Sequence, residues 1–328
     1  MTIVGRPNVG KSTLLNRLVG RKLAITSPKP QTTRNRITGV VNRDRAQIVF
    51  IDTPGIHRPK HKLGEYMVGV AMAALEEVEA ILFVVEAPEP PGPGDRYVAE
   101  RLSRVRTPVL LVVNKADLCP GDVTRANVES YLKLGEFAGH LAISAVRDES
   151  FELLLRTIES LLPEGPRYYP EGIDTDQPEA FVIAELVREK VLETTRDEVP
   201  HSVAVVVEEL RPGGRRAGVA EDQAGDPRGG QLADQREDQR EAPRAGPLGD
   251  APDLVYARAV IYVERESQKG IIVGSGGTML RDVGRRARRE IEALFGTKVY
   301  LDLWVKVEKN WRDRAGVLRA LGYASQRE

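Results

Sequence analysis

Short apolar runs alternate with segments of helical periodicity in the first half of the chain. Apolar residues in the intervening segments recur every three or four positions, as on one face of a helix. Such alternation is typical of an α/β domain whose mostly parallel sheet is covered by helices on both faces. The predicted strands are Thr2–Val4, Gln47–Ile51, Ala80–Val85, Val109–Val113 and Leu141–Ser144. The predicted helices are Lys11–Leu18, Leu63–Leu75, Asp95–Leu102 and Ser150–Leu161.

A different order of elements follows residue 178. The pattern predicts a helix, two strands, a helical turn with a loop, a second helix and a last strand, which together form an α+β unit. Pro178 suits a helix start, and the Val199-Pro200 pair prevents the helix from continuing. The predicted segments are Pro178–Arg196, His201–Glu208, Arg258–Glu264, Ser267–Gly277, Thr278–Phe295 and Lys298–Val307.

Two segments show neither the helical nor the strand pattern. Residues 163–177 are rich in proline and predict a linker between a domain at 1–162 and a second at 178–328. Residues 211–253 hold too few large apolar residues to offset the entropy cost of ordering, and they interrupt a β-hairpin. We predict a disordered insertion. Its composition also fits the off-frame reading of a GC-rich gene, so compensating frameshifts remain an alternative, and a further alternative is that the insertion inactivates the chain.

Charge is unevenly distributed, although the formal net charge is zero. Residues 255–328 hold 15 Lys and Arg against 9 Asp and Glu, so they carry +6 and residues 1–254 carry −6. A basic module of this kind indicates a polyanionic partner, and a solvated helix face is the alternative. The single cysteine, Cys119, excludes a disulfide framework. With no apolar run of about 20 residues and no signal peptide, we expect a cytoplasmic protein.

A glycine-rich loop joins the first predicted strand to the first predicted helix. Gly5–Ser12 matches G-x-x-x-x-G-K-[ST], whose backbone N–H groups and helix N-terminus bind phosphate. We expect Lys11 to contact the β- and γ-phosphates and Ser12 to ligate Mg²⁺. A chance glycine-rich turn is the alternative, which the flanking strand and helix disfavour. The predicted phosphate-binding residues are Gly5, Arg6, Pro7, Asn8, Val9, Gly10, Lys11, Ser12 and Thr13.

Two further segments predict a sensor of the nucleotide state. Asp52-Thr53-Pro54-Gly55 ends a strand, where Asp52 can hold Mg²⁺ through water and the Gly55 N–H can contact a γ-phosphate. In the polar segment Gln31–Arg34 one threonine should bind Mg²⁺; we favour Thr33, Thr32 remains open, and an ordinary surface loop is the alternative. The predicted catalytic residues are Lys11, Thr33 and Gly55, and the predicted metal ligands are Ser12, Thr33 and, through water, Asp52.

A third pair of loops predicts recognition of guanine. Asn114-Lys115-Ala116-Asp117 ends a strand, and the Asp117 carboxylate can accept hydrogen bonds from guanine N1–H and N2–H₂. Asn114 can link this loop to the phosphate loop, while the Lys115 stem can cover the base. The segment Ile143-Ser144-Ala145 ends the next strand and can offer a backbone N–H to guanine O6. A pocket of this kind rejects adenine because buried polar groups would be left unpaired.

The residue after Gly55 is Ile56, where Ras-like GTPases carry the glutamine that orients water. An apolar side chain cannot orient water, so we expect slow intrinsic hydrolysis. His57 could substitute for the glutamine, and an exposed loop histidine is the alternative. An alternative function is therefore an RNA-binding protein whose G domain binds GTP and GDP with little hydrolysis.

The loop Gly274–Gly277 precedes the arginine-rich helix and matches the GXXG loop of KH domains, which holds about four nucleotides of single-stranded RNA or DNA. We expect Ile271–Val273 to form the floor of the groove. A glycine-rich turn on a basic surface is the alternative. The predicted RNA-binding residues are Lys269, Gly274, Ser275, Gly276, Gly277, Arg281, Arg285 and Arg288.

Across residues 1–209 and 254–328 the chain resembles the Era family of bacterial GTPases. The matching segments read GRPNVGKSTLLNRL, QTTRNRITGV, DTPGIH, NKAD, ISA, VERESQKGIIVGSGG and KVYLDLWVKV. The resemblance implies a Ras-like P-loop GTPase domain and a type II KH domain, binding near the 3′ end of 16S rRNA, and a role in maturation of the small (30S) ribosomal subunit. It also implies peripheral association with the inner face of the cell membrane and a K⁺ site at Asn8. We expect a monomer with GTP or GDP and Mg²⁺ as cofactors.

Three departures from the family pattern are visible. Family members have several residues before the position of Met1, so the first strand is expected to weaken a sheet edge unless the native start lies upstream. Ser275 replaces a lysine that would contact phosphate. The segment 211–253 replaces a short turn and is expected to impair RNA binding if its flanking strands do not pair.

Overall fold

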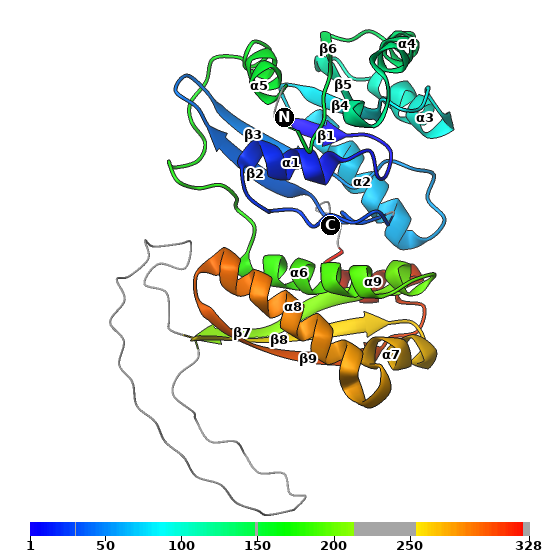
Figure 1. Cartoon of the computed structure of the whole chain (residues 1–328), viewed down its shortest axis with the longest axis vertical. Coiled ribbons are helices and arrows are strands. Elements are labelled where there is room, and N and C mark those ends of the chain that lie inside the picture. The colour runs from blue at the N-terminus through cyan, green and yellow to red at the C-terminus, as the bar shows by residue number, and fades with distance from the viewer. Residues whose placement is uncertain (30, 148–149, 213–253, 324–328) are drawn as a thin grey trace, which may run out of the picture.

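The structure is a computed structural model that describes residues 1–29, 31–147, 150–212 and 254–323. The chain forms two units, one built on a six-stranded sheet and the other on a three-stranded sheet, which lie against each other (Figure 1). The predicted insertion falls almost wholly at residues 213–253, outside the described residues. Residues 148 and 149, just before the predicted helix Ser150–Leu161, also lie outside the described residues.

The six-stranded sheet has the order β2-β3-β1-β4-β5-β6, in which only β2 and β3 pair antiparallel. Its strands are β1 Thr2–Val4, β2 Ile37–Asn42, β3 Gln47–Asp52, β4 Ile81–Glu86, β5 Val109–Asn114 and β6 Gly139–Ala142. Its helices are α1 Lys11–Val19, α2 Lys62–Glu76, α3 Pro93–Leu102, α4 Gly121–Leu132 and α5 Phe151–Glu159. A short 3₁₀ turn spans Ala116–Leu118.

Both faces of this sheet are covered, because alternate residues of each buried strand point to opposite sides. In β4, Leu82 and Val84 pack with α1 and α5, whereas Ile81 and Phe83 pack with α2, α3 and α4. These two apolar layers explain why the strands read as continuous hydrophobic runs. The predicted mostly parallel α/β domain is confirmed.

Some predictions about this domain were wrong. The sequence pattern missed β2 and α4, and β6 ends at Ala142 rather than at Ser144. The expected weak sheet edge at the N-terminus was wrong because β1 is an interior strand. Thr2 pairs with both β3 and β4, and the Met1 amino group donates to Val49 O at 2.7 Å.

The second unit has a sheet of order β7-β8-β9, with β8 antiparallel to β7 and parallel to β9. Helices α6 and α8 cover one of its faces (Figure 1). Its strands are β7 Ala204–Pro212, β8 Leu254–Val263 and β9 Lys298–Val307. Its helices are α6 Glu179–Thr194, α7 Glu266–Val273, α8 Thr278–Phe295 and α9 Ala315–Ala320, with 3₁₀ turns at Val199–Ser202, Ser275–Gly277 and Trp311–Asp313.

The region around the insertion differs from expectation at its borders. Strand β7 continues to Pro212, which pairs with Val255, so Arg211 and Pro212 belong to the sheet. The flanking strands therefore pair, contrary to the concern that the insertion would separate them. The segment predicted as a turn and loop contains α7, an eight-residue helix. The sequence also gave no indication of α9.

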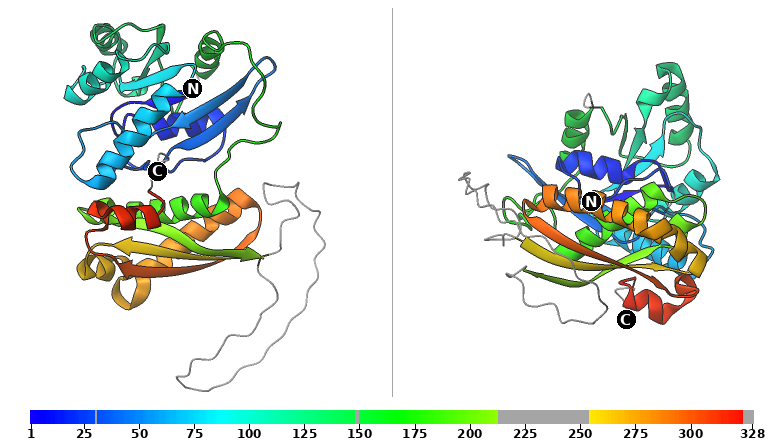
Figure 2. Two further views of the ribbon diagram at one scale, coloured as in Figure 1. Left: turned by 180° about the vertical axis from the view of Figure 1, so that it is seen from behind. Right: turned by 60° about the horizontal axis from the view of Figure 1, so that its bottom comes forward.

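Two connections join the units. Residues 163–177, predicted as a linker, run along β2, where the Val40 N–H donates to Asp174 O at 2.8 Å and Thr175 Oγ1 donates to Thr38 O at 2.6 Å. At the C-terminal end, helix α9 lies on the side of the second unit that faces α2 (Figure 2). There Trp311 and Tyr323 share an apolar cluster with Met67 of α2. The two units thus meet through a buried apolar contact as well as through the chain.

Candidate nucleotide-binding site and RNA-binding groove

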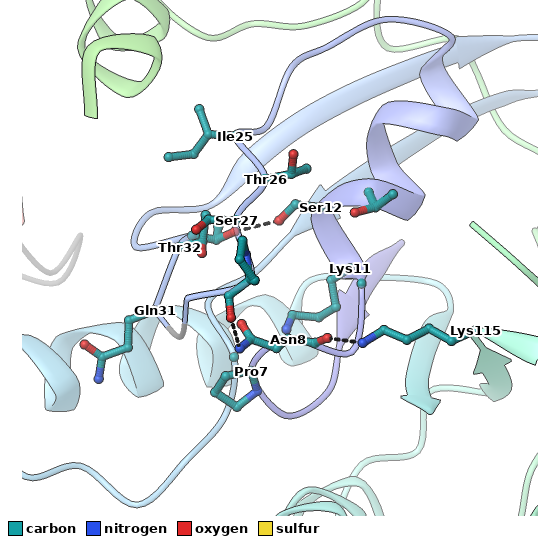
Figure 3. Close-up of a pocket in the computed structure, with 15 residues that line it drawn as sticks. Pro7, Asn8, Lys11, Ser12, Ile25, Thr26, Ser27, Gln31, Thr32 and Lys115 are labelled. Carbon is teal, nitrogen blue, oxygen red and sulfur yellow. Dashed lines mark hydrogen bonds between the residues drawn. The ribbon is translucent and has the colours of Figure 1, made fainter. Parts of the chain in front are cut away.

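The glycine-rich loop lies between β1 and α1, beside a cavity of about 560 Å³ (Figure 3). Gly10 begins α1 in the left-handed region at φ 95°, and a Cβ there would lie 2.3 Å from Asn114 Nδ2. A Cβ at Gly5 would lie 2.3 Å from Val84 O. Glycine is required at both positions because the loop packs directly on the ends of β4 and β5.

Three oxygen-bearing side chains meet at the start of α1. Ser12 Oγ donates to Asp52 Oδ2 at 2.6 Å and lies 2.7 Å from Thr33 Oγ1, which is itself 3.2 Å from Asp52 Oδ2. Thr32 Oγ1 instead donates to Lys29 O at 2.7 Å. The structure therefore brings Thr33, and not Thr32, to Ser12 and Asp52. Two hydroxyls beside a carboxylate form the kind of hard oxygen set that Mg²⁺ takes.

The Asp52 carboxyl and the Lys11 ammonium are both buried in this corner. Burial raises the pKa of Asp52, although Lys11, Ser12 and Thr33 oppose the shift. Among the described residues Asp52 Oδ1 has no hydrogen-bond partner, so this oxygen is available to accept a hydrogen bond from a metal-bound water. Burial lowers the pKa of Lys11 to about 8, and its Nζ donates to Arg6 O at 3.1 Å. The negative charge of a bound phosphate would offset the cost of burying this ammonium.

Asn114 joins three loops of the pocket. Its Nδ2 donates to Val9 O at 2.9 Å, and its Oδ1 accepts the Ala145 N–H at 2.9 Å. Lys115 Nζ donates to Asn8 O at 2.9 Å (Figure 3) and pairs with Glu86. The Ala145 N–H, one of the backbone donors of the segment expected near guanine O6, is thus bonded to Asn114 in this structure.

Asp117 and Ser144, the remaining residues of the predicted base loops, do not line the cavity. Asp117 is half-buried in the 3₁₀ turn after β5. Ser144 is buried, and its Oγ has no hydrogen-bond partner in the described part of the chain.

Only some of the predicted nucleotide-binding residues line the cavity. Those that do are Pro7, Asn8, Gly10, Lys11, Ser12, Thr13, Thr33, Gly55 and Lys115. Those that do not are Gly5, Arg6, Val9, Asp52, Thr53, Pro54, Asn114, Asp117, Ser144 and Ala145. Arg6 turns away toward Glu86 and Asp95, so only its backbone can contribute to the loop. Val9 is buried in the apolar core, and Thr53 Oγ1 donates to Ile3 O at 2.8 Å.

The sequence missed one wall of the cavity. Residues Ile25, Thr26, Ser27 and Pro28 form it, next to Gln31 and Thr32 of the predicted polar segment. The wall is held to the loop by Asn8, whose Nδ2 donates to Pro28 O at 2.8 Å. The only sequence signal for this wall was its position between the first helix and Thr33.

Ile56 lies in the apolar core and points away from the cavity. His57 is half-buried, and its Nδ1 lies 2.8 Å from Gly55 O, while its Nε2 lies 3.4 Å from Gln31 Nε2. Position 56 thus supplies no group that can hold a water molecule. His57 is not fully exposed, and its ring nitrogens contact Gly55 and Gln31 rather than Ser12, Thr33 or Asp52.

The segment that carries Thr33 is also bound by the second unit. Arg34, the next residue, is buried and donates to Val203 O at 2.6 Å and to Tyr323 Oη at 3.3 Å. Its guanidinium lies 5.6 Å from the centre of the Trp311 ring. From α6, Arg188 donates to the Thr32 carbonyl. Thr33 therefore contacts Ser12 and Asp52, while the adjacent Arg34 contacts the core of the second unit.

The GXXG loop lies between α7 and α8, with Gly274, Gly276 and Gly277 at φ 71°, 56° and 77°. A Cβ at Gly274 would lie 2.9 Å from Met279 Cβ. The neighbouring cavity has a volume of about 570 Å³ and is lined by Gly277, Leu280, Arg281, Gly284, Arg285, Arg288, Tyr300, Leu301 and Leu303. Predicted residues Arg285 and Arg288 are exposed here, whereas Ser275 lies in the 3₁₀ turn and Lys269 is half-buried on α7.

Two expectations about the groove change. Ile272 is fully buried in the core, and none of Ile271–Val273 lines the cavity beside the loop, whose apolar lining is Leu280, Leu301 and Leu303. Arg281 Nη2 donates to Gly276 O at 2.7 Å, so this arginine supports the loop itself.

Comparison with known proteins finds a match for each of the two units. Residues 1–115 match the family model for a 50S ribosome-binding GTPase, and residues 252–312 match the model for a KH domain. GTPase Era of Staphylococcus epidermidis is 44% identical over 328 residues, which cover all of this chain and 97% of the relative. The chain belongs to the Era family of GTPases.

Solved Era structures are similar over nearly the whole chain. Era of Aquifex aeolicus, bound to GDP and AlF₄⁻, is 38% identical with a TM-score of 0.84, and the match covers 99% of this chain and 98% of that one. A second Era structure, with the same identity, TM-score and coverage, holds MgGDPNP and nucleotides 1506–1542 of 16S rRNA. The predictions of a P-loop GTPase and of an Era-family pairing with a KH domain are confirmed.

Proposed function

We propose that this Era-family GTPase is a GTP-hydrolysing switch that binds 16S rRNA through its KH domain and assists maturation of the small ribosomal subunit. The observation that carries the proposal is the position of Thr33 and Arg34. Thr33 lies against Ser12 and Asp52, while Arg34 is buried against Val203, Trp311 and Tyr323. If Thr33 moves when the γ-phosphate binds or is released, that movement would pass to Arg34 across one peptide bond and so to the KH domain.

Each residue of the pocket has a proposed role in that switch. The loop Gly5–Thr13 binds phosphates, Lys11 neutralises their charge, and Gly55 offers its N–H to the γ-phosphate. Ser12 and Thr33 would hold Mg²⁺ directly and Asp52 through water, and the bound ion would neutralise charge on the β- and γ-phosphates. Asp117 would read guanine, with Asn114, Lys115, Ser144 and Ala145 shaping the base pocket. Because Ile56 is buried, slow unassisted hydrolysis follows.

The RNA partner is proposed from the groove and from the relatives. Exposed Arg285 and Arg288 border the apolar floor beside the GXXG loop. The Era complex with nucleotides 1506–1542 of 16S rRNA supports the same segment as the ligand of this chain. Ser275 lowers the number of cations at the loop, but Arg281 and Arg288 remain.

The decisive experiment measures GTP turnover with and without that RNA segment, in wild type and in Arg34→Lys and Arg34→Ala. We expect GTP binding and no ATP binding, and turnover that responds to RNA in wild type but not in Arg34→Ala. Lys11→Ala should abolish turnover in every condition. Equal binding of ATP and GTP would contradict the assignment of the base pocket. An unchanged RNA response in Arg34→Ala would contradict the coupling.

A second function is favoured by Ile56 alone, namely an RNA-binding protein that retains GTP or GDP with little hydrolysis. Turnover with Mg²⁺, K⁺ and small ribosomal subunits discriminates the two. If wild type and Lys11→Ala release phosphate at the same rate, the chain is a binder; if only wild type is stimulated, it is the switch.

Several finer properties are proposed from the sequence pattern and from the family. The domains would span 1–162 and 178–328, K⁺ would bind at Asn8, and the protein would be a cytoplasmic monomer that associates peripherally with the membrane. Helices long and apolar enough to cross a membrane are absent from the described part of the chain. Replacing K⁺ by Na⁺ in the turnover assay, light scattering and flotation with vesicles test these properties in turn.

A further inference from the structure

The sheet of the KH domain has a second face, opposite the one covered by α6 and α8. Near the G domain this face is closed, because Trp311 and Leu318 pack beside Ala204. Its other end carries aromatic rings that remain open to solvent. Tyr300 is 61% exposed and Trp304 is 54% exposed.

These rings are held in place although nothing in the described chain covers them. Asp302 Oδ2 accepts hydrogen bonds from Trp304 Nε1 at 2.9 Å and from Tyr256 Oη at 3.2 Å. The Tyr256 and Tyr300 rings stack with their centres 5.8 Å apart and 12° between their planes. The Arg211 guanidinium lies 4.5 Å from the centre of the Tyr256 ring. Fixed, exposed aromatic surface of this kind marks an interaction site.

The aromatic face is continuous with the RNA-binding groove. Strand β9 is the edge of the sheet, and Tyr300 belongs to both surfaces. It lines the groove cavity together with Arg288 and Leu303, and its ring stacks on Tyr256 on the far side of the edge. A nucleic-acid strand that leaves the groove over β9 would therefore meet Tyr300 first and Trp304 or Tyr256 next.

We propose that Tyr256, Tyr300 and Trp304 form a second RNA subsite, which stacks unpaired bases of the same strand that the GXXG groove binds. This inference rests on the proposed RNA-binding function. Aromatic rings and arginine planes stack bases of any sequence, which is how single-stranded nucleic acid is bound on sheet surfaces. The carboxylates Glu208, Glu209 and Asp302 nearly balance the cations around the rings, so stacking rather than charge supplies the affinity.

Tryptophan fluorescence reports directly on this face. The chain has two tryptophans, and Trp311 is fully buried, so quenching by acrylamide reports chiefly on Trp304. The probes are single-stranded fragments from nucleotides 1506–1542 of 16S rRNA, lengthened one nucleotide at a time from the shortest that binds. We expect the shortest fragment to leave Trp304 accessible. Longer fragments should protect it and bind about tenfold more tightly, which corresponds to about 1.4 kcal/mol.

Variants separate the two subsites. Trp304→Ala should remove the tenfold gain of the long fragments and leave the shortest fragment unaffected, whereas Trp304→Phe should retain most of the gain. Tyr168→Ala is the matched control, because Tyr168 is 71% exposed but belongs to the segment before α6. Thermal unfolding of each variant verifies that the fold is intact.

The outcomes distinguish this inference from the proposed function. If long and short fragments bind wild type equally, or if Trp304 stays accessible in the long complexes, the second subsite is wrong while RNA binding in the groove stands. If no fragment binds, the proposed RNA-binding function itself fails. Protection of Trp304 by RNA-free ribosomal proteins, and not by RNA, would assign the face to a protein partner and overturn the proposal.

Discussion

Two glycine-rich loops precede helices in this chain, and their surroundings differ. The loop that ends at Gly10 is enclosed by β4, β5 and the wall at residues 25–28, and its cation Lys11 is buried. The loop Gly274–Gly277 lies at the surface, and the arginines beside it are exposed. The enclosed loop at Gly10 therefore suits a ligand of one geometry, whereas the open loop Gly274–Gly277 can accommodate a flexible chain.

This difference determines what each loop can contribute. Buried charges in a low-dielectric site interact strongly and discriminate between ligands, because a wrong ligand leaves them unpaired. Exposed arginines supply affinity that is screened by salt and carries little sequence information. Substitutions in the first loop should therefore change specificity by large factors, and those in the second should change affinity by small ones.

The largest effect is expected from Asp117→Asn. An amide there keeps one acceptor for N1–H but turns a donor toward position 2 of the base, where guanine carries N2–H₂ and xanthine carries an oxygen. GTP affinity should therefore fall by about 10⁴-fold while xanthosine triphosphate affinity rises. Titration with both nucleotides measures the change. RNA binding to the KH groove should be unaffected, and a variant that loses both ligands equally would indicate unfolding rather than altered recognition.

A pair of glycine substitutions compares the loops directly. Gly10→Ala places a Cβ 2.3 Å from Asn114 Nδ2 at φ 95°, so nucleotide affinity should fall at least about 100-fold. Gly276→Ala at φ 56° has no neighbour within 4 Å, so its cost is the left-handed strain of about 1–2 kcal/mol. Nucleotide and RNA titrations of both variants test this. Equal losses would mean that the two loops are equally constrained.

Removing a side chain that supports the enclosed loop should lower the stability of the fold more than removing one that supports the open loop. Asn114→Ala leaves the Val9 carbonyl and the Ala145 N–H without their partner in a buried site, at a cost of about 1–3 kcal/mol for each group. Arg281→Ala frees the Gly276 carbonyl at the surface, where water replaces the bond. Urea unfolding should show a large loss for Asn114→Ala and under about 1 kcal/mol for Arg281→Ala. A larger loss for Arg281→Ala would reverse the comparison.

The sequence predicted the enclosed loop better than the open one. Parallel strands end at one edge of a sheet, so Asp52 and Asn114 could be placed beside the glycine-rich loop from their positions alone. The floor of the groove was misassigned because Ile272 and Leu280 are equally apolar, and only packing decides that Ile272 enters the core while Leu280 lines the cavity.

Other features were missed where local pattern carries no signal. Strand β2 is an edge strand whose apolar pattern is interrupted by Thr38 and Gly39, and α4 has few apolar residues to mark a stripe. The contacts of Arg34 with Trp311 and Tyr323 join residues far apart in sequence and follow only from the docking of the two units.

The smallest effect is expected from single arginines of α8, and it tests whether the groove binds by charge. Arg288 lines the groove, whereas Arg286 pairs with Glu193 of α6. Arg288→Ala should weaken RNA binding about fivefold at low salt and reduce the slope of log affinity against log salt by about 0.7, the value for one phosphate contact on a single strand. Arg286→Ala is the matched control, with little change in slope. If both variants lower the slope equally, binding follows the net charge of the helix, and the groove does not select which arginine contacts phosphate.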